Sequence, residues 1–431
     1  MKARVLIITF LVVLINNTVA QNSDYDILYT ACVDNKCGFV DQNGNWVIKP
    51  QYDDVYKFAS NGLAAVKSGD KWGYVDKSGK IVIPLQFIRA YSFAENGLAL
   101  VERVLEDDEY DKRPSPMCYI DKTGKIVISL KNARDAGSFD ENGLACFCSS
   151  IKEEKYGYIN SKGKVVVKPQ FGWTKPFDKD GFACVELNDE WGCIDPKGNT
   201  VFRPKYHECF RFATNGLACV RLSGDYGFTN LKGEMVIQGY DACQDFSDNG
   251  LAPVNLDNKW GYIDQTGKMV IEPQFYWADG FKSNGLARVQ LFNYDWGYID
   301  QTGKMVIEPQ FYWAEGFENG LALVRLSNRA YGYIDQTGKM VIEPQFYWAR
   351  SFESNGLASV ELFNGKWGYI DKTGKMVIEP QFEEAEGFES NGLARVKLNG
   401  KWGYIDQTGK MVIEPKFDRI NFSDEQTIFP D

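Results

Sequence analysis

The side chains that could carry chemistry in this 431-residue chain are ten cysteines, one histidine and carboxylates that recur along the sequence. The single histidine, His207, excludes every metal site that needs several histidines. The sequence has neither a paired CxxC zinc pattern nor the D-x-D-x-D-G loop of calcium sites. We therefore expect no metal site and no cofactor.

The recurring carboxylates could be imagined as the acid pair of a glycoside hydrolase. The repeated aspartate, however, opens a turn in nearly every unit, and an active site does not need so many copies. We expect a structural role for these residues and no enzymatic activity. They are Asp76, Asp264, Asp300, Asp335, Asp371 and Asp406, with Glu272, Glu308, Glu343, Glu379 and Glu414.

The cysteines occupy recurring positions. Cys32, Cys146, Cys184 and Cys219 take the variable place in Leu-Ala-x-Val, and Cys209 and Cys243 take the place of Ala278, which suggests packing substitutions. Two pairs are different, because two-residue turns would place them directly opposite each other on adjacent strands, within disulfide distance. These predicted disulfides are Cys184–Cys193 and Cys32–Cys37.

Pairs of adjacent aromatic residues recur between the predicted sheets and form the candidate ligand surface. Aromatic rings spaced along a surface suit sugar faces or extended peptides. The alternative is that one ring of each pair, more often the Trp, fills the space between units. The pairs are Tyr276-Trp277, Tyr312-Trp313 and Tyr347-Trp348.

All these side chains belong to a repeat of eleven units with a period of about 36 residues. Eight units contain an aromatic-Gly-aromatic pattern, and three contain a degenerate copy: Cys37-Gly38-Phe39, Met117-Cys118-Tyr119 and Trp191-Gly192-Cys193. In the last unit, residues 393–398, 401–406 and 410–414 alternate as strands, and Asn399-Gly400 is a two-residue hairpin signal. Each unit is therefore predicted to be a three-stranded antiparallel meander followed by a linker. The turns predict that Val396 pairs with Gly403, and Gly403 with Ile413.

A single three-stranded sheet of this size is barely stable, so the units must stack on one another. Propellers usually have about 4–8 four-stranded blades, which eleven three-stranded units fit poorly. We expect an all-β tandem array that forms an open, superhelical, solenoid-like stack. Closure into one or two propeller-like rings is the alternative.

Residues 1–20 are predicted to be a secretory signal peptide, with Lys2 and Arg4 before an eleven-residue apolar run that ends near a cleavage site after Ala20. Residues 21–30 form a short segment, 31–417 the repeat array, and 418–431 a tail or cap. We expect an exported protein (periplasmic, cell-surface or secreted) with no membrane span in the mature chain. The net charge of −10 argues against nucleic-acid binding through a basic surface.

The repeated core, such as Trp402-Gly403-Tyr404-Ile405-Asp406, followed by Phe-x-x-Ala and Gly-Leu-Ala-x-Val, resembles the WG-repeat (KWG-repeat) family. The resemblance covers nearly all of the chain after residue 30. It implies an all-β bacterial repeat protein that acts as an interaction module, and it supplies no catalytic residues. The sequence therefore predicts a scaffold that binds a protein or peptide partner along its surface. A glycan-binding envelope protein that uses the linker aromatics is the alternative.

Overall fold

The computed structural model describes residues 27–103, 116–130, 133, 135–149, 154–178, 181–208 and 212–421. These residues form strands, turns and loops. Within them, no helix is long and apolar enough to cross a membrane. The predicted signal peptide lies outside the described residues, as do most of the short segment that follows it and residues 422–431 of the predicted tail.

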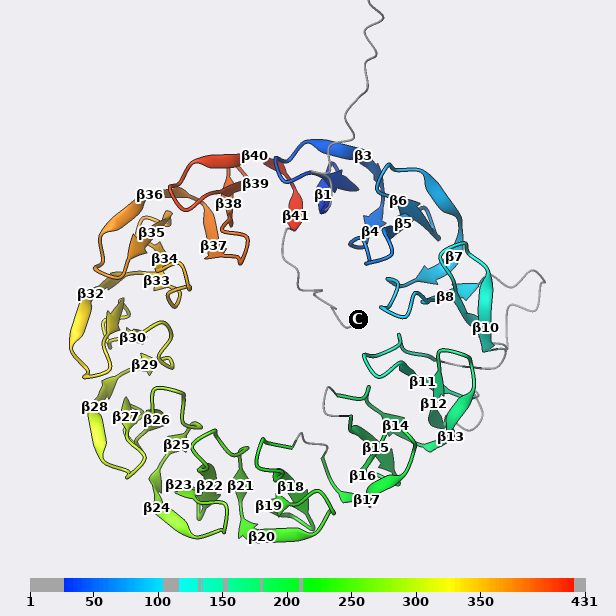
Figure 1. Cartoon of the computed structure of the whole chain (residues 1–431). Helices are drawn as coiled ribbons and strands as arrows, with labels where there is room; N and C mark the ends of the chain where they lie inside the picture. The colour runs from blue at the N-terminus through cyan, green and yellow to red at the C-terminus, as the bar shows by residue number, and fades with distance from the viewer. Residues whose placement is uncertain are drawn as a thin grey trace, which may run out of the picture.

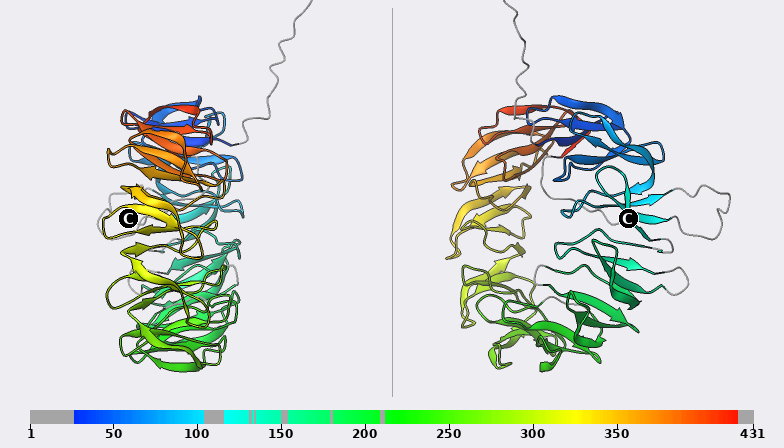
Figure 2. Two further views of the ribbon diagram at one scale, coloured as in Figure 1. Left: turned by 90° about the vertical axis from the view of Figure 1, so that its left-hand side faces the viewer. Right: turned by 45° about the vertical axis from the view of Figure 1, so that its right-hand side comes forward.

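The strands form a closed ring of eleven blades, with the chain running once around it (Figure 1). Seen edge-on, the ring is a flat disc (Figure 2). The described strands make ten hydrogen-bonded sheets, one of which contains two blades because β7 is the outer strand of blade 2 and the inner strand of blade 3. The expected all-β tandem array of small antiparallel meanders is confirmed.

The blades are numbered along the chain, and each is named by the strands that it contains. Blade 1 contains β1 (Tyr29–Val33), β2 (Lys36–Val40), β3 (Trp46–Tyr52) and β41 (Arg419–Asn421); blade 2, β4 (Asp54–Val55), β5 (Leu63–Ser68), β6 (Lys71–Asp76) and β7 (Ile81–Ala90); blade 3, β8 (Ala99–Arg103), β9 (Met117–Ile120) and β10 (Ile126–Leu130); blade 4, β11 (Leu144–Cys148), β12 (Tyr156–Asn160) and β13 (Val165–Phe171). Blade 5 contains β14 (Trp173–Thr174), β15 (Ala183–Leu187), β16 (Glu190–Ile194) and β17 (Thr200–Tyr206); blade 6, β18 (Ala218–Leu222), β19 (Asp225–Thr229) and β20 (Met235–Tyr240); blade 7, β21 (Ala242–Cys243), β22 (Ala252–Leu256), β23 (Lys259–Ile263) and β24 (Met269–Phe275). Blade 8 contains β25 (Trp277–Ala278), β26 (Ala287–Gln290), β27 (Trp296–Ile299) and β28 (Met305–Phe311); blade 9, β29 (Trp313–Ala314), β30 (Ala322–Arg325), β31 (Tyr331–Ile334) and β32 (Met340–Phe346); blade 10, β33 (Trp348–Ala349), β34 (Leu357–Glu361), β35 (Trp367–Asp371) and β36 (Met376–Phe382); blade 11, β37 (Glu384–Phe388), β38 (Ala394–Leu398), β39 (Lys401–Ile405) and β40 (Met411–Phe417).

Most blades have four strands, because the segments predicted to be linkers contribute a short strand of their own. In blade 8, β25 pairs with β26 through Trp277↔Gln290 and Ala278↔Val289. This short strand is innermost in the blade, and the strand that ends in Pro-Gln-Phe is outermost (Figure 1). The linker thus carries the chain from the outer strand of one blade to the inner strand of the next.

The first and last described strands pair with each other and close the ring. The expected open, superhelical stack is therefore wrong, and closure into a propeller-like ring, the alternative, is correct. The last strand, β41, pairs with β1 through Ala31↔Ile420, and Asp34 N–H donates to the carboxylate of Asp418 at 2.8 Å. Within the segment predicted to be a tail or cap, Arg419–Asn421 are therefore the inner strand of blade 1. The objection to a propeller rested on the three strands of each unit and on the number of units. The linkers supply a fourth strand in most blades, and the ring closes with eleven blades, more than is usual for a propeller.

The predicted register of the last unit is largely correct. Val396 pairs with Gly403, but Ile413 pairs with Tyr404 and not with Gly403. The difference arises from a bulge between β39 and β40, which shifts the ladder by one residue. The backbone around Pro415 consequently lies over Gly403, where a side chain would have been.

Both sides of each blade are covered by neighbouring blades. Alternation around the two-residue turn predicts a core face with Ala394, Val396, Ile405 and Ile413, and an aromatic and charged side with Tyr404. Ala394, Val396 and Ile405 are buried together against blade 10, but Ile413 is buried on the opposite side with Tyr404, because the bulge moves it there. The aromatic and charged side is thus an interface between blades, and this double covering supplies the core that a single meander lacks.

Candidate functional site

The predicted aromatic pairs lie at the crossovers that lead from an outer strand into the next inner strand. All six rings are exposed, with relative exposures of 40–47% for the tryptophans and 42–62% for the tyrosines. The tryptophans are therefore not buried core residues between the units, as the alternative interpretation had it. The six residues are Tyr276, Trp277, Tyr312, Trp313, Tyr347 and Trp348, and they belong to three consecutive blades, 8 to 10.

One side of each crossover tryptophan does contact the preceding blade. The ring of Trp277 lies 5.1 Å from that of Trp260, and the ring of Trp348 lies 5.2 Å from that of Tyr331. The corresponding distance from Trp313 to Trp296 is 6.2 Å. Each tryptophan is thus supported by the preceding blade and exposed to solvent elsewhere, as in a binding platform.

The connections between the second and third strands of blades 8–10 add further aromatic rings, which sequence reasoning missed. Blade 11 has the two-residue turn Asn399-Gly400, whereas in blade 8 Leu291 N–H donates to the carbonyl of Asp295 across a longer turn. This turn displays Phe292 and Tyr294, with exposures of 52% and 60%. The sequence contained a signal for these exposed rings, because in blade 8 the longer segment Leu-Phe-Asn-Tyr-Asp stands where blade 11 has a two-residue turn.

The turn residues contact the crossover residues of the same blade. The Tyr276 ring lies 5.0 Å from Tyr294 and 5.8 Å from Phe292, in edge-to-face arrangements. In blade 10 the Tyr347 ring lies 5.8 Å from Phe363, which is 66% exposed. We call the nine exposed rings of blades 8–10 the aromatic patch. It consists of Tyr276, Trp277, Phe292, Tyr294, Tyr312, Trp313, Tyr347, Trp348 and Phe363.

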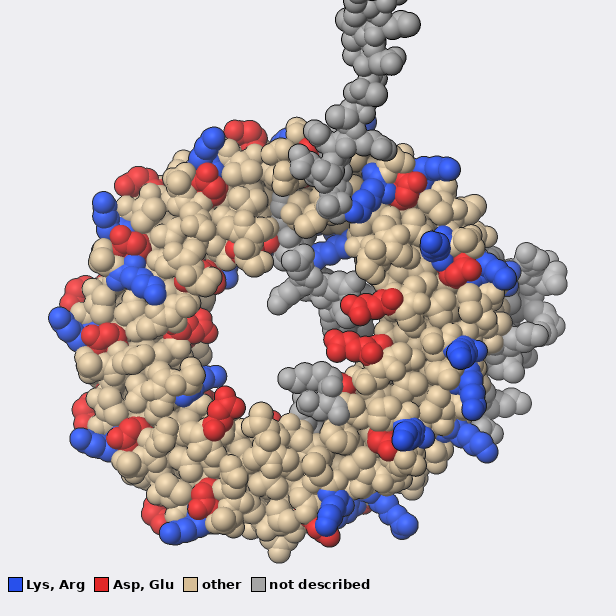
Figure 3. Space-filling view, in the orientation of Figure 1, with Lys and Arg blue, Asp and Glu red and all other residues tan. Residues whose placement is uncertain are grey.

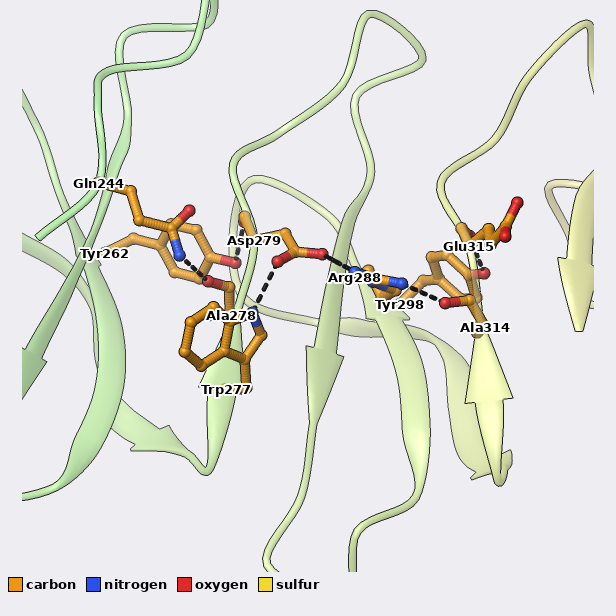
Figure 4. Close-up of polar contacts among 9 residues, drawn as sticks. All are labelled: Gln244, Tyr262, Trp277, Ala278, Asp279, Arg288, Tyr298, Ala314 and Glu315. Atoms are coloured by element: carbon orange, nitrogen blue, oxygen red, sulfur yellow. Dashed lines mark hydrogen bonds and ion pairs between the residues drawn. The ribbon is translucent and has the colours of Figure 1, made fainter. Parts of the chain in front are cut away.

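A network of polar contacts orients the blade 8 part of this patch (Figure 4). The Asp279 carboxylate accepts hydrogen bonds from Trp277 Nε1 at 2.7 Å and from Arg288 Nε at 2.6 Å. Arg288 also donates to the carbonyl of Ala314 in blade 9, and its guanidinium lies 5.6 Å from the Trp313 ring. These contacts fix two exposed tryptophans before any ligand arrives, which lowers the entropic cost of binding.

The positions of Arg288 and Ala314 also link neighbouring blades elsewhere in the ring. Arg395 occupies the position of Arg288, is ion-paired with Glu386, and donates at 3.0 Å to the carbonyl of Ile420 in blade 1. Blades 6 and 7 are joined at these positions by a disulfide between Cys219 and Cys243. The variable place in Leu-Ala-x-Val is therefore where one blade is attached to the next.

This attachment explains the outcome for the predicted disulfides. Cys32 and Cys37 are bonded to each other in blade 1, as predicted. Ala31 pairs with Gly38 as Val396 pairs with Gly403, so Cys32 occupies the position of Lys397 and not the variable place that the sequence suggested. Cys184 and Cys193 are opposite in register, as predicted, but they are not bonded: Cys184 forms a different disulfide, and Cys193 keeps a buried free thiol. The Cys184–Cys193 prediction is wrong because the side chain at the position of Cys184 faces the neighbouring blade.

The repeated tyrosine of the Trp-Gly-Tyr pattern also joins blades. Tyr262 donates its hydroxyl hydrogen bond to the carbonyl of Asp279 at 2.8 Å, from blade 7 to blade 8 (Figure 4). Blades 2, 3, 4, 8, 9 and 10 have the same contact, seventeen residues along the chain in every case except blade 3, where Tyr119 donates to the carbonyl of Gly137, eighteen residues along. Burial raises the pKa of these tyrosines, so they remain neutral donors.

The repeated aspartates hold the turns between the third and fourth strands. The Asp300 carboxylate accepts from Thr302 Oγ1 at 2.6 Å, from Thr302 N at 2.9 Å and from Lys304 N at 3.1 Å. These hydrogen bonds, chiefly that of the Thr302 hydroxyl, lower the pKa of Asp300. Side chains of both signs are visible around the central opening and along the outer edge (Figure 3). Among the described residues, no group of three or more potential ligands could hold a metal ion.

Comparisons with known proteins identify the repeat. The family described as "WG containing repeat" matches ten stretches: residues 38–72, 72–103, 156–191, 191–224, 226–260, 260–293, 296–329, 331–367, 367–402 and 402–426. No curated protein matches the chain.

Solved structures that align with the chain have low sequence identity and low TM-scores. A crystal structure of a eukaryotic initiation factor aligns with a TM-score of 0.42 and 11% identity over 83% of this chain and 96% of its own. BamB from Moraxella catarrhalis aligns with a TM-score of 0.32 and 10% identity over 72% and 95%. The designed protein Ika8 aligns with a TM-score of 0.31 and 9% identity over 66% and 98%.

Proposed function

The chain belongs to the WG-repeat family, and from that premise we propose that it is a non-enzymatic, exported scaffold that binds a protein or peptide partner through the aromatic patch. The observation that carries the proposal is the exposure of nine aromatic rings on three consecutive blades. Tyr, Trp and Arg are enriched where proteins bind one another tightly, because rigid rings supply contact area at little entropic cost. The aromatic patch, held on the closed ring of blades, is therefore suited to binding a protein or peptide.

The disulfides support export. Structural disulfides persist in oxidising compartments and are rare in the cytosol. The Cys32–Cys37 and Cys219–Cys243 bonds therefore agree with the predicted signal peptide over residues 1–20. The turn role of the repeated aspartates supports the non-enzymatic assignment, because their carboxylates already accept hydrogen bonds from the backbone.

The proposal is tested by recovering the partner from an extract of the envelope of the producing cells and titrating it against purified variants. The double variant Trp313→Ala/Trp348→Ala should lower affinity at least tenfold, as expected for interface aromatics. Trp173→Ala is the matched control. Trp173 is 51% exposed and begins the inner strand of blade 5, where Asn188-Asp189 forms a short hairpin turn without exposed rings. Equal loss in both variants would contradict a patch-specific function.

Binding of an envelope glycan is the second candidate, and it is favoured by three identical segments. Residues 261–278, 297–314 and 332–349 have the same sequence, so three crossovers present the same Tyr-Trp pair. A regular polymer would meet equivalent rings on successive blades. Tryptophan fluorescence titrated with soluble cell-wall fragments tests this candidate. A saturable change that is lost in Trp313→Ala/Trp348→Ala supports it, and a flat response rejects it.

A further inference from the structure

Blade 9 differs from its two neighbours within the aromatic patch. Where blade 8 displays Phe292 and Tyr294 and blade 10 displays Phe363, the blade 9 turn displays Arg329. Arg329 is exposed, and its N–H donates to the Leu326 carbonyl at 3.0 Å. The centre of the patch is therefore cationic, and its two sides are aromatic.

A second arginine lies beneath this turn. The Arg325 guanidinium lies 5.6 Å from the Tyr312 ring and 5.2 Å from the Tyr331 ring, and its Nε donates to the Arg329 carbonyl at 3.3 Å. Stacking on two rings holds the planar group in place, and Arg325 is partly exposed.

Neither arginine is neutralised by the part of the chain that the structure describes. Arg288 and Arg395 are ion-paired with Asp279 and Glu386, but no described carboxylate forms an ion pair with Arg325 or Arg329. In a chain with a net charge of −10, this is a local positive site. An ordered guanidinium without a carboxylate partner is complementary to an anionic group.

We propose that the aromatic patch binds an extended peptide segment in which a carboxylate side chain lies between two apolar side chains. The carboxylate pairs with Arg325 and Arg329, one apolar side chain packs on Tyr276, Phe292 and Tyr294, and the other packs on Tyr347 and Phe363. This proposal rests on the proposed function and specifies the chemistry of its partner. The order of groups in the ligand follows the order of blades 8, 9 and 10.

The blade turns favour a peptide over an acidic polysaccharide. The crossover pairs are identical in the three blades, but the turns beside them present rings, then a cation, then a ring again. A homopolymer would bring the same group to all three blades. A peptide supplies different side chains in succession, as these three unlike positions require.

The test uses immobilised synthetic peptides that contain Phe, Glu and Phe separated by Gly-Ser spacers of several lengths, probed with the full purified protein. We expect at least one spacer length to bind, and Glu→Gln in that peptide to weaken binding about tenfold, as does Arg329→Ala in the protein. Adding salt should weaken the Glu peptide more than the Gln peptide. Lys71→Ala, at a hairpin turn in blade 2, is the matched control and should bind as the unaltered protein does.

The outcomes separate this inference from the proposed function. Equal binding of the Glu and Gln peptides, with loss in Phe292→Ala/Phe363→Ala, overturns the acidic requirement and leaves the aromatic site intact. Binding of polygalacturonate that depends on Arg329, with no peptide bound, overturns the peptide in favour of an acidic glycan. If no peptide binds and the envelope partner is insensitive to the aromatic variants, both proposals are wrong.

Discussion

The hydroxyl of Tyr298 in blade 8 donates a hydrogen bond of 2.5 Å to the backbone carbonyl of Glu315, on the inner strand of blade 9. Tyr298 is 1% exposed, and its hydrogen bond to this carbonyl is partly buried. The substitution Tyr298→Phe keeps the ring and removes the donor of this partly buried hydrogen bond. We expect the free energy of unfolding to fall by about 1–3 kcal/mol.

Denaturant unfolding followed by tryptophan fluorescence measures that change. Tyr312→Phe is the control, because Tyr312 is 62% exposed and its hydroxyl can be solvated. If both substitutions had the same small effect, the repeated tyrosine would act through ring packing alone.

Gly403 is predicted to tolerate no side chain. A Cβ at this position would lie 2.8 Å from the Pro415 nitrogen and closer still to the Ile413 carbonyl oxygen, both of them backbone atoms that cannot move aside independently. Gly403→Ala should therefore destabilise the protein by about 1–3 kcal/mol or separate β39 from β40. Thermal unfolding measures the effect. Glu414→Ala is the control, because Glu414 is exposed. An unchanged midpoint would show that the bulge adjusts without cost.

A new covalent link between blades 9 and 10 should form spontaneously under oxidising conditions. Leu323 and Ala349 occupy the same positions in blades 9 and 10 as Cys219 and Cys243 do in blades 6 and 7. The Cα atoms of the bonded Cys219 and Cys243 are 6.0 Å apart. In Leu323→Cys/Ala349→Cys we expect one additional disulfide, detected by mass spectrometry of the unreduced protein. The single variant Leu323→Cys should keep a free thiol. A double variant that stays reduced would show that blade spacing differs between the two junctions.

Acidification is predicted to weaken the turns. Hydrogen bonds, first that of the Thr373 hydroxyl, lower the pKa of Asp371 in the folded state below that of the unfolded chain. The ionised carboxylate therefore stabilises the fold at and above pH 4, the approximate pKa of an unfolded aspartate, and this contribution is lost as the pH falls through the lower folded-state value. Stability measured by denaturant unfolding should decrease steeply below about pH 4.

Asp371→Asn offers a matched test of that cause. Asn160 already holds the equivalent turn in blade 4, where its Oδ1 accepts from Lys162 N at 3.0 Å. We expect the variant to fold and to lose less stability on acidification than the unaltered protein. An identical acid response would assign the effect to other carboxyl groups.

The sequence by itself determined the local structure of each unit. The Asn399-Gly400 turn specifies the pairing of Val396 with Gly403, because a two-residue hairpin leaves no freedom of register. Alternation along the strands likewise identified Ala394, Ile405 and their neighbours as core residues. These predictions succeeded because they depend on residues close together in the chain.

Only the tertiary structure decided how the units meet. The pairing of Ala31 with Ile420, the bond between Cys219 and Cys243, and the exposure of Trp313 all depend on how one blade is rotated against the next. That rotation accumulates over eleven blades, so a small difference at each junction separates a closed ring from an open superhelix. Turns and alternation fix the geometry within a blade, whereas ring closure depends on packing between residues as distant as Asp34 and Asp418.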